Sequence, residues 1–223
     1  YNKALMSDPL SAFGGVLITN AKVDVESANE INKLFFEVLI APKFDDRSLE
    51  ILKEKKNRII LRMNDFELDN VSSKKLLGGY LQQDLDIAEN NVENWNTVTK
   101  SIPSNEQLSD LEFANKIVKH SKSNAIVLVK GNHMVSSGVG QTSRVDALKH
   151  AIEKAKTFGF EVEGSVMASD AFFPFPDCIE IAANAGIHSV VQPGGSIKDN
   201  LSIEACNKAK ISMVVTGMRH FYH

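Results

Sequence analysis

Several features are scarce or missing in this sequence, and each absence excludes a class of protein. The two cysteines, Cys178 and Cys206, have no CxxC or CxxH spacing, so neither a disulfide framework nor a structural zinc site is predicted. No apolar run reaches the roughly 20 residues of a membrane helix, and no secretory start is present. We therefore expect a chain that works in a reducing, cytoplasmic setting and not in a membrane.

The sequence also lacks a large excess of charge of either sign, because it has 25 Lys and Arg and 28 Asp and Glu, for a formal net charge of -3. This balance offers no field for steering toward nucleic acid, so no nucleic-acid partner is expected. The HExxH, GxSxG and HxE with PCxxC patterns are absent, which excludes zinc proteases, serine hydrolases and zinc deaminases. The sequence starts at Tyr1 rather than a methionine, which indicates that it begins inside a longer polypeptide.

What is present is an alternation of helix and strand patterns, typical of a layered α/β/α fold. Strands are predicted at residues 16–19, 38–41, 59–63, 125–129, 134–139, 162–167, 189–192 and 211–216, of which 16–19, 38–41 and 125–129 are expected to be buried. Helical apolar stripes lie at residues 28–35, 49–56, 111–120, 142–155, 178–185 and 203–206. The polar stretch Asp84–Gln107 has no sustained apolar period and predicts a surface connector between halves at about 1–85 and 108–223.

Ligands of open α/β sheets gather where strands end, and one such end is rich in aromatic residues. The loop Ala168–Asp177 places three phenylalanines and two prolines before a helix that Asp177 can cap. A rigid apolar slot with a carboxylate at its rim suits a flat heteroaromatic ring. Alternatively, the phenylalanines belong to the core and Asp177 is only an N-cap.

Other strand ends carry weaker signals. The turn Gln192–Ser196 has paired glycines that permit close backbone approach, but a simple strand-to-helix turn is the better explanation for them. Arg219 can form a bidentate pair of hydrogen bonds with a phosphate, or it can belong to a solvent-exposed tail. Asn124 precedes a buried strand and can serve a ligand or a turn. The segment Gly138–Arg144 lacks the spacing of nucleotide triphosphate loops, so such a site is rejected.

Together, five segments resemble AICAR transformylase in order and spacing, over essentially the whole chain. They are residues 7–15, 122–126, 138–144, 169–177 and 219–223. The resemblance implies the C-terminal part of the AICAR transformylase domain, with a cytidine-deaminase-like α/β fold that is duplicated and has no zinc. It further implies transfer of a formyl group from 10-formyltetrahydrofolate to the 5-amino group of AICAR, in a homodimer with shared active sites.

The resemblance also implies roles for single residues. Asp8 would contact the nucleotide ribose and Arg219 its phosphate, while Asn124 would contact the carboxamide region and the formyl oxygen. The Phe172 backbone would hold the amine and carboxamide. The pterin slot would be walled and anchored by Val145, Pro174, Phe175 and Asp177. A potassium ion near Ser121, Ser123 and Asp170 is a further implication, and the roles of His220 and His223 stay open.

One departure from the family pattern bears on activity. The lysine–histidine pair that assists formyl transfer in the family would lie upstream of Tyr1, as would the IMP cyclohydrolase domain. General acid–base assistance is typically worth about 10² to 10⁴ in rate, so we expect this chain alone to be nearly inactive. The alternatives are a non-catalytic nucleotide- or folate-binding module and a structural dimerisation domain.

Overall fold

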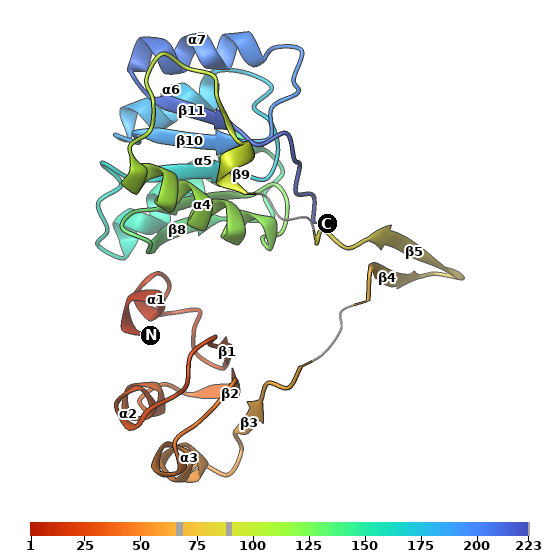
Figure 1. Ribbon diagram of the computed structural model, residues 1–223, viewed down its shortest axis with the longest axis vertical. Helices are drawn as coiled ribbons and strands as arrows, with labels where there is room; N and C mark the ends of the chain where they lie inside the picture. The colour runs from red at the N-terminus through yellow and green to blue at the C-terminus, as the bar shows by residue number, and fades with distance from the viewer. Residues whose placement is uncertain (66–68, 88–90, 223) are drawn as a thin grey trace. The chain divides into compact units, whose positions relative to one another are not determined.

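The computed structural model in Figure 1 describes residues 1–65, 69–87 and 91–222. The chain separates into two compact units, Tyr1–Ile87 and Ala88–His223. The boundary lies within the stretch for which a connector was predicted, and the assignment of the units to one transformylase domain stays a prediction. Within the described ranges, no helix is long and apolar enough to cross a membrane.

The first unit is built on a three-stranded parallel sheet with the order β1-β2-β3. Its elements are α1 (Asn2–Met6), β1 (Gly15–Ile18), α2 (Val25–Asn32), β2 (Phe36–Ala41), α3 (Asp46–Lys53) and β3 (Ile59–Arg62). Helices α2 and α3 bury Ala28, Ile31 and Leu52 against Phe36 and Leu39 of β2. Apolar residues at helical spacing thus meet the strand in one small core.

Two predictions for this unit need correction. The strand predicted at 16–19 is not fully buried, because Val16 and Ile18 are 65% and 69% exposed on the sheet face that the core cluster does not use. The helix predicted to reach Phe35 ends at Asn32, since the chain must turn there to enter β2. The hairpin β4 (Val71–Leu76) and β5 (Gly79–Asp84), in which every residue is exposed, was not predicted at all.

The second unit holds a six-stranded sheet with the order β6-β11-β10-β9-β7-β8. Its strands are β6 (Asn96–Thr97), β7 (Ile126–Val129), β8 (Met134–Gly138), β9 (Val166–Ser169), β10 (Ser189–Gln192) and β11 (Ser212–Val215). Strands β9, β10 and β11 run parallel, whereas β7 is antiparallel to both β8 and β9. The predicted hairpin from β7 to β8 is confirmed.

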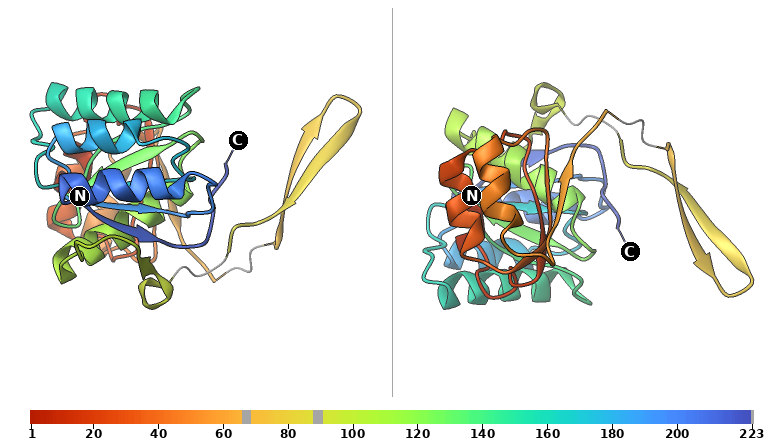
Figure 2. Two further views of the ribbon diagram at one scale, coloured as in Figure 1. Left: turned by 90° about the horizontal axis from the view of Figure 1, so that it is seen from above. Right: turned by 90° about the horizontal axis from the view of Figure 1, so that it is seen from below.

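Helices cover both faces of this sheet. They are α4 (Asn105–Lys119), α5 (Arg144–Thr157), α6 (Asp177–Asn184) and α7 (Asp199–Ala209), preceded by the short η1 (Val92–Asn94). Figure 2 shows α5, α6 and α7 in one row, on the opposite side of the strands from α4. Alternate residues of β7 point to the two layers: Val127 and Val129 join α4, whereas Ile126 and Leu128 join α5. The predicted α/β/α layering is confirmed.

Three boundaries in the second unit differ from prediction. Helix α4 begins at Asn105 rather than Leu111, because Ser104 and Gln107 form a capping box. Strand β9 begins at Val166 rather than Val162. Part of the predicted connector is not a surface loop, since residues 96–97 pair with β11 as an edge strand. Strands this short carry no period that a sequence pattern can reveal.

Candidate functional site

The second unit brings several predicted site residues to one edge of its sheet. Strands β8, β9 and β11 end there, so the segments that follow them meet at this edge, which we call the carboxyl edge. The antiparallel strand β7 begins at the same edge, which adds Asn124. This arrangement places Asn124, Arg144, Asp170, Phe172 and Arg219 around the strand ends, where open α/β sheets bind their ligands.

Arg144, at the start of α5, connects three of the segments at the carboxyl edge. Its Nη2 donates to Asn124 Oδ1 at 2.9 Å and to Asp170 Oδ1 at 3.0 Å. Its Nη1 donates to the Phe172 carbonyl at 3.3 Å. The ion pair is buried, with side chains that are 11% and 0% exposed for Arg144 and Asp170. In a low-dielectric setting such a charge-assisted network fixes the relative positions of the groups it joins.

The side chain of Asn124 has a defined orientation within this network. Its Nδ2 donates to the carbonyls of Gln141 and Thr142 at 3.0 and 3.2 Å, while Oδ1 accepts from Arg144. Both amide hydrogens are therefore engaged, and the atom with spare capacity is Oδ1. Oδ1 can accept from an amine or a carboxamide nitrogen, whereas donation to a formyl oxygen requires Nδ2 to leave one of the two carbonyls.

The three phenylalanines of the loop after β9 differ in their environments. Phe173 is fully buried in the core, and its N–H donates to the buried Gln192 side chain at 3.2 Å. Phe172 is half-buried, and within the described part of the chain its backbone N–H meets no hydrogen-bond acceptor. Phe175 is 50% exposed. Lys198 Nζ lies 4.6 Å from the Phe175 ring centroid. The loop is thus anchored by Phe173, while the Phe172 N–H stays open and the Phe175 ring is partly exposed beside Lys198.

The predicted slot residues lie on this loop and on the two helices that follow strand ends. Pro174 and Asp177 are half-buried, and Val145 packs at the margin of the α5–α6 core. Asp177 is the first residue of α6 rather than its N-cap, which is Pro176. Its Oδ1 accepts from the Cys178 N–H at 2.8 Å, and among the described residues nothing pairs with Oδ2. That oxygen can accept a hydrogen bond from a ligand.

Arg219 follows β11 and presents an available cation. Its guanidinium lies 5.1 Å from the Phe172 ring centroid and 4.9 Å from that of Phe221. No carboxylate in the described ranges pairs with it. The segment is not a frayed tail, because the His220 N–H donates to the Asp170 carbonyl at 3.0 Å and His220 is only 1% exposed. Cation–π contacts of this kind hold a guanidinium in place while its N–H groups stay free to bind an anion.

Asp8 lies in the first unit, apart from the other candidates in the sequence. Its Oδ1 accepts from the Ser11 N–H at 2.9 Å, so the carboxylate stabilises the turn that follows α1. His223 lies outside the described residues.

Sequence reasoning missed Arg144 and Gln192 as site residues. Arg144 stood in a segment that was rejected as a phosphate loop and that entered the family resemblance without a role for Arg144. The signal that could have found it is the Ser143-Arg144 pair. The Ser143 hydroxyl accepts a hydrogen bond from the Asp146 N–H and so caps α5, which makes Arg144 the first residue of a helix that begins at the sheet edge. The role of Gln192 depends on Phe173 across the sheet and has no local signal.

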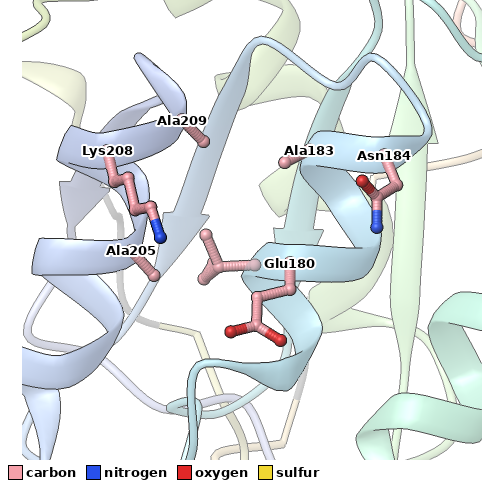
Figure 3. Close-up of a pocket in the computed structure, with 7 residues that line it drawn as sticks. Glu180, Ala183, Asn184, Ala205, Lys208 and Ala209 are labelled. Carbon is pink, nitrogen blue, oxygen red and sulfur yellow. The ribbon is translucent and has the colours of Figure 1, made fainter.

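A separate pocket of about 420 Å³ lies between α6 and α7, as Figure 3 shows. Ile179, Glu180, Ala183, Asn184, Ala205, Lys208 and Ala209 line it. None of the predicted site residues belongs to this lining. Among the described residues, no three His, Cys, Asp or Glu side chains are grouped to hold a metal ion. The carboxyl edge of the second unit is thus the better candidate site.

The second unit is thus an α/β layered domain in which Arg219 lies beside aromatic rings at the strand ends, the place where proteins of this class bind small molecules. A model of the AICARFT/IMPCHase bienzyme family matches residues 1–154. The chain is also 59% identical to the bifunctional purine biosynthesis protein PurH of Bacteroides thetaiotaomicron, covering 100% of this chain and 44% of that protein. It is 49% identical to PurH of Aquifex aeolicus, over 99% and 43% of the two chains.

The chain belongs to the AICARFT/IMPCHase bienzyme family. It spans less than half the length of these curated relatives. Among solved structures, the dCMP deaminase of cyanophage S-TIM5 covers 50% of this chain at 15% identity and a TM-score of 0.37. A Thermotoga maritima deaminase/reductase covers 47% at 22% identity and a TM-score of 0.31. Likenesses at such TM-scores add nothing to the fold described above, so the deaminase-like arrangement and its duplication stay predictions.

Proposed function

We propose that this chain is the C-terminal part of an AICAR transformylase domain and that the carboxyl edge of its second unit carries the nucleotide and folate sites. The reaction would transfer the formyl group of 10-formyltetrahydrofolate to the 5-amino group of AICAR. The longer protein would also cyclise the product to IMP, in the cytoplasm, as a homodimer with shared active sites. Family membership and the printed names of the relatives support this proposal.

The observation that carries the proposal is the set of groups left open around Arg144. Arg144 holds Asn124, Asp170 and the Phe172 carbonyl in fixed positions. Beside them the Phe172 N–H and the Arg219 guanidinium have no polar partner among the described residues. A carboxamide, an amine and a phosphate on one small ligand would match this set of groups.

In this proposal each open group takes one part of the nucleotide. The Phe172 N–H would donate to the carboxamide oxygen of AICAR, and Asn124 Oδ1 would accept from a nitrogen of the amine or carboxamide. Arg219 would bind the phosphate, a charge-assisted contact worth roughly 1.5 to 3 kcal/mol. Asp8 would contact the ribose.

The pterin would lie against the exposed part of the loop after β9. Phe175, Pro174 and Val145 would form apolar walls, and Asp177 Oδ2 would accept hydrogen bonds from the ring nitrogens. The amine of AICAR is conjugated with its ring and is therefore a poor nucleophile, which needs a positioned base. The lysine–histidine pair that the family uses would come from the rest of the longer protein, so this chain alone would be nearly inactive.

A potassium ion belongs to the same proposal. Asp170 is fully buried, and its Oδ2 has no hydrogen-bond partner among the described residues. The hydroxyls of Ser121 and Ser123 are further oxygen ligands of the hard type that such ions prefer. A monovalent cation there would be held by Asp170 Oδ2, the oxygen that the ion pair with Arg144 leaves without a partner, together with the two hydroxyls.

The proposal is tested by calorimetry with AICAR and with a non-hydrolysable folate analogue. We expect Arg219→Ala to weaken AICAR binding about 10- to 100-fold, since one charge-assisted contact is lost, and to leave folate binding nearly unchanged. Asp177→Asn should do the reverse. Lys116→Ala, which removes an exposed charge on α4, is the control. Unchanged AICAR affinity in the Arg219→Ala protein would rule out the assignment.

A non-catalytic binding module would give the same calorimetry. The two are separated in the full-length protein, where Arg219→Ala should lower formyl transfer while leaving IMP cyclohydrolase activity intact. Full-length protein that binds both ligands and transfers no formyl group would favour the non-catalytic module.

A further inference from the structure

A second pocket, of about 570 Å³, lies in the first unit and has no part in the proposed function. It is bounded by the segments that follow β1 and β2, by α3 and by the edge strand β3. Four cations line it: Lys22, Lys43, Lys53 and Arg62. The lining holds one carboxylate, Asp46. The pocket is therefore strongly basic in a chain whose overall net charge is -3.

Most of this positive charge is not neutralised by neighbouring side chains. Lys22 forms an exposed ion pair with Asp45 at 2.9 Å. Within the described ranges, Lys43, Lys53 and Arg62 have neither an ion pair nor a side-chain hydrogen bond. Because the cations outnumber the nearby carboxylates, they repel one another, and a bound anion reduces this repulsion.

The rest of the pocket lining is apolar. Phe44, Leu49 and Ile60 contribute half-buried side chains from three different elements. A pocket that joins an apolar wall to a few charged groups is typical of sites for small organic molecules, and its volume lies in the usual range for them. A purely inorganic anion would leave this wall unused.

The position of the pocket supports the same reading. Strands β1, β2 and β3 are parallel, so the segments that follow them meet at one edge of the sheet. Lys22 and Lys43 lie in the segments after β1 and β2, and Arg62 is the last residue of β3. Crevices at this edge are where ligands of parallel α/β sheets bind.

We propose that this pocket binds a phosphorylated small molecule with an aromatic ring, of the nucleoside polyphosphate type. Its phosphates contact Lys43 and Arg62, with Lys22 nearby, and its ring lies on Phe44 and Leu49. Several unpaired cations suit more than one phosphate, so affinity rises from mono- to triphosphate. This site is distinct from the proposed formyltransferase site and does not depend on it.

Calorimetry with AMP, ADP and ATP on the whole chain tests the proposal, in the Arg219→Ala background so that the anion site of the second unit does not contribute. We expect the Lys43→Ala/Arg62→Ala variant to bind ATP about 100-fold more weakly, about tenfold for each lost cation. The control is Lys56→Ala, which removes one positive charge just after α3 and outside the pocket. It should change ATP affinity less than about twofold, because exposed charges at a distance are screened by salt.

Three results would overturn the proposal. The first is a folded chain that gives no binding heat with ATP. The second is an equal loss of affinity in the Lys56→Ala control, which would indicate general attraction to a basic surface. The third is inorganic tripolyphosphate that binds as tightly as ATP, because the apolar wall would then have no role. None of these results bears on whether AICAR binds at Arg219.

Discussion

Replacing Arg144 by alanine should destabilise the second unit strongly. The change removes the partner of a carboxylate that is 0% exposed and three hydrogen bonds of 2.9, 3.0 and 3.3 Å. Breaking a buried ion pair by removing one partner typically costs about 3 to 5 kcal/mol, because the remaining charge stays buried and unpaired. We therefore expect Arg144→Ala to lower the free energy of unfolding by that amount.

The assay is urea unfolding followed by the fluorescence of Trp95. Trp95 is the only tryptophan of the chain and packs beside the α4 core, so its signal reports on the second unit. The control is Lys116→Ala, which breaks an exposed pair with Glu112 at 2.6 Å and should cost at most about 1 kcal/mol. The double variant Arg144→Ala/Asp170→Ala should lose less stability than the sum of the two single variants, because it leaves no unpaired charge buried. A cost below about 1 kcal/mol for Arg144→Ala would refute the reasoning.

Two further predictions concern packing and ionisation. Gly138→Ala should lower the free energy of unfolding by more than about 2 kcal/mol in the same urea experiment. The reason is that a Cβ at this position would lie 1.9 Å from the Ala147 carbonyl oxygen and would push β8 away from α5. A smaller loss would mean that the two elements are not in such close contact. Burial raises the pKa of Cys178 and of Cys206 from 9.0 to about 12, so native protein should react slowly with iodoacetamide at pH 8, whereas rapid labelling would contradict the burial. Because both thiols are harder to ionise in the folded state, stability should also fall as the pH rises from about 9 toward 12.

Much of the fold could be predicted because its signals are local. Strand β10 and the β7–β8 hairpin follow from short apolar runs and from the turn at Gly131-Asn132. The elements that escaped prediction depend on partners far away in the sequence. Strand β6 exists because Asn96 and Thr97 pair with β11, more than a hundred residues later.

The candidate site likewise contains residues that the sequence could indicate and residues whose role depends on distant partners. The loop after β9 and Arg219 could be named as candidates, because the family resemblance assigns them roles that their residue types alone leave open. The sequence could not rank the three phenylalanines, since only packing makes Phe173 a core residue and leaves Phe175 exposed. Nor could it identify Arg144 as the residue that joins Asn124 to Asp170, because that role exists only once three strand ends meet.

The central claim is that the carboxyl edge of the second unit holds a nucleotide with its phosphate on Arg219. The most direct measurement is a crystal structure of the chain with AICAR bound. The account predicts the phosphate within hydrogen-bond distance of the Arg219 guanidinium and the carboxamide at the Phe172 N–H. AICAR bound elsewhere, or Arg219 turned to solvent beside an occupied site, would contradict it.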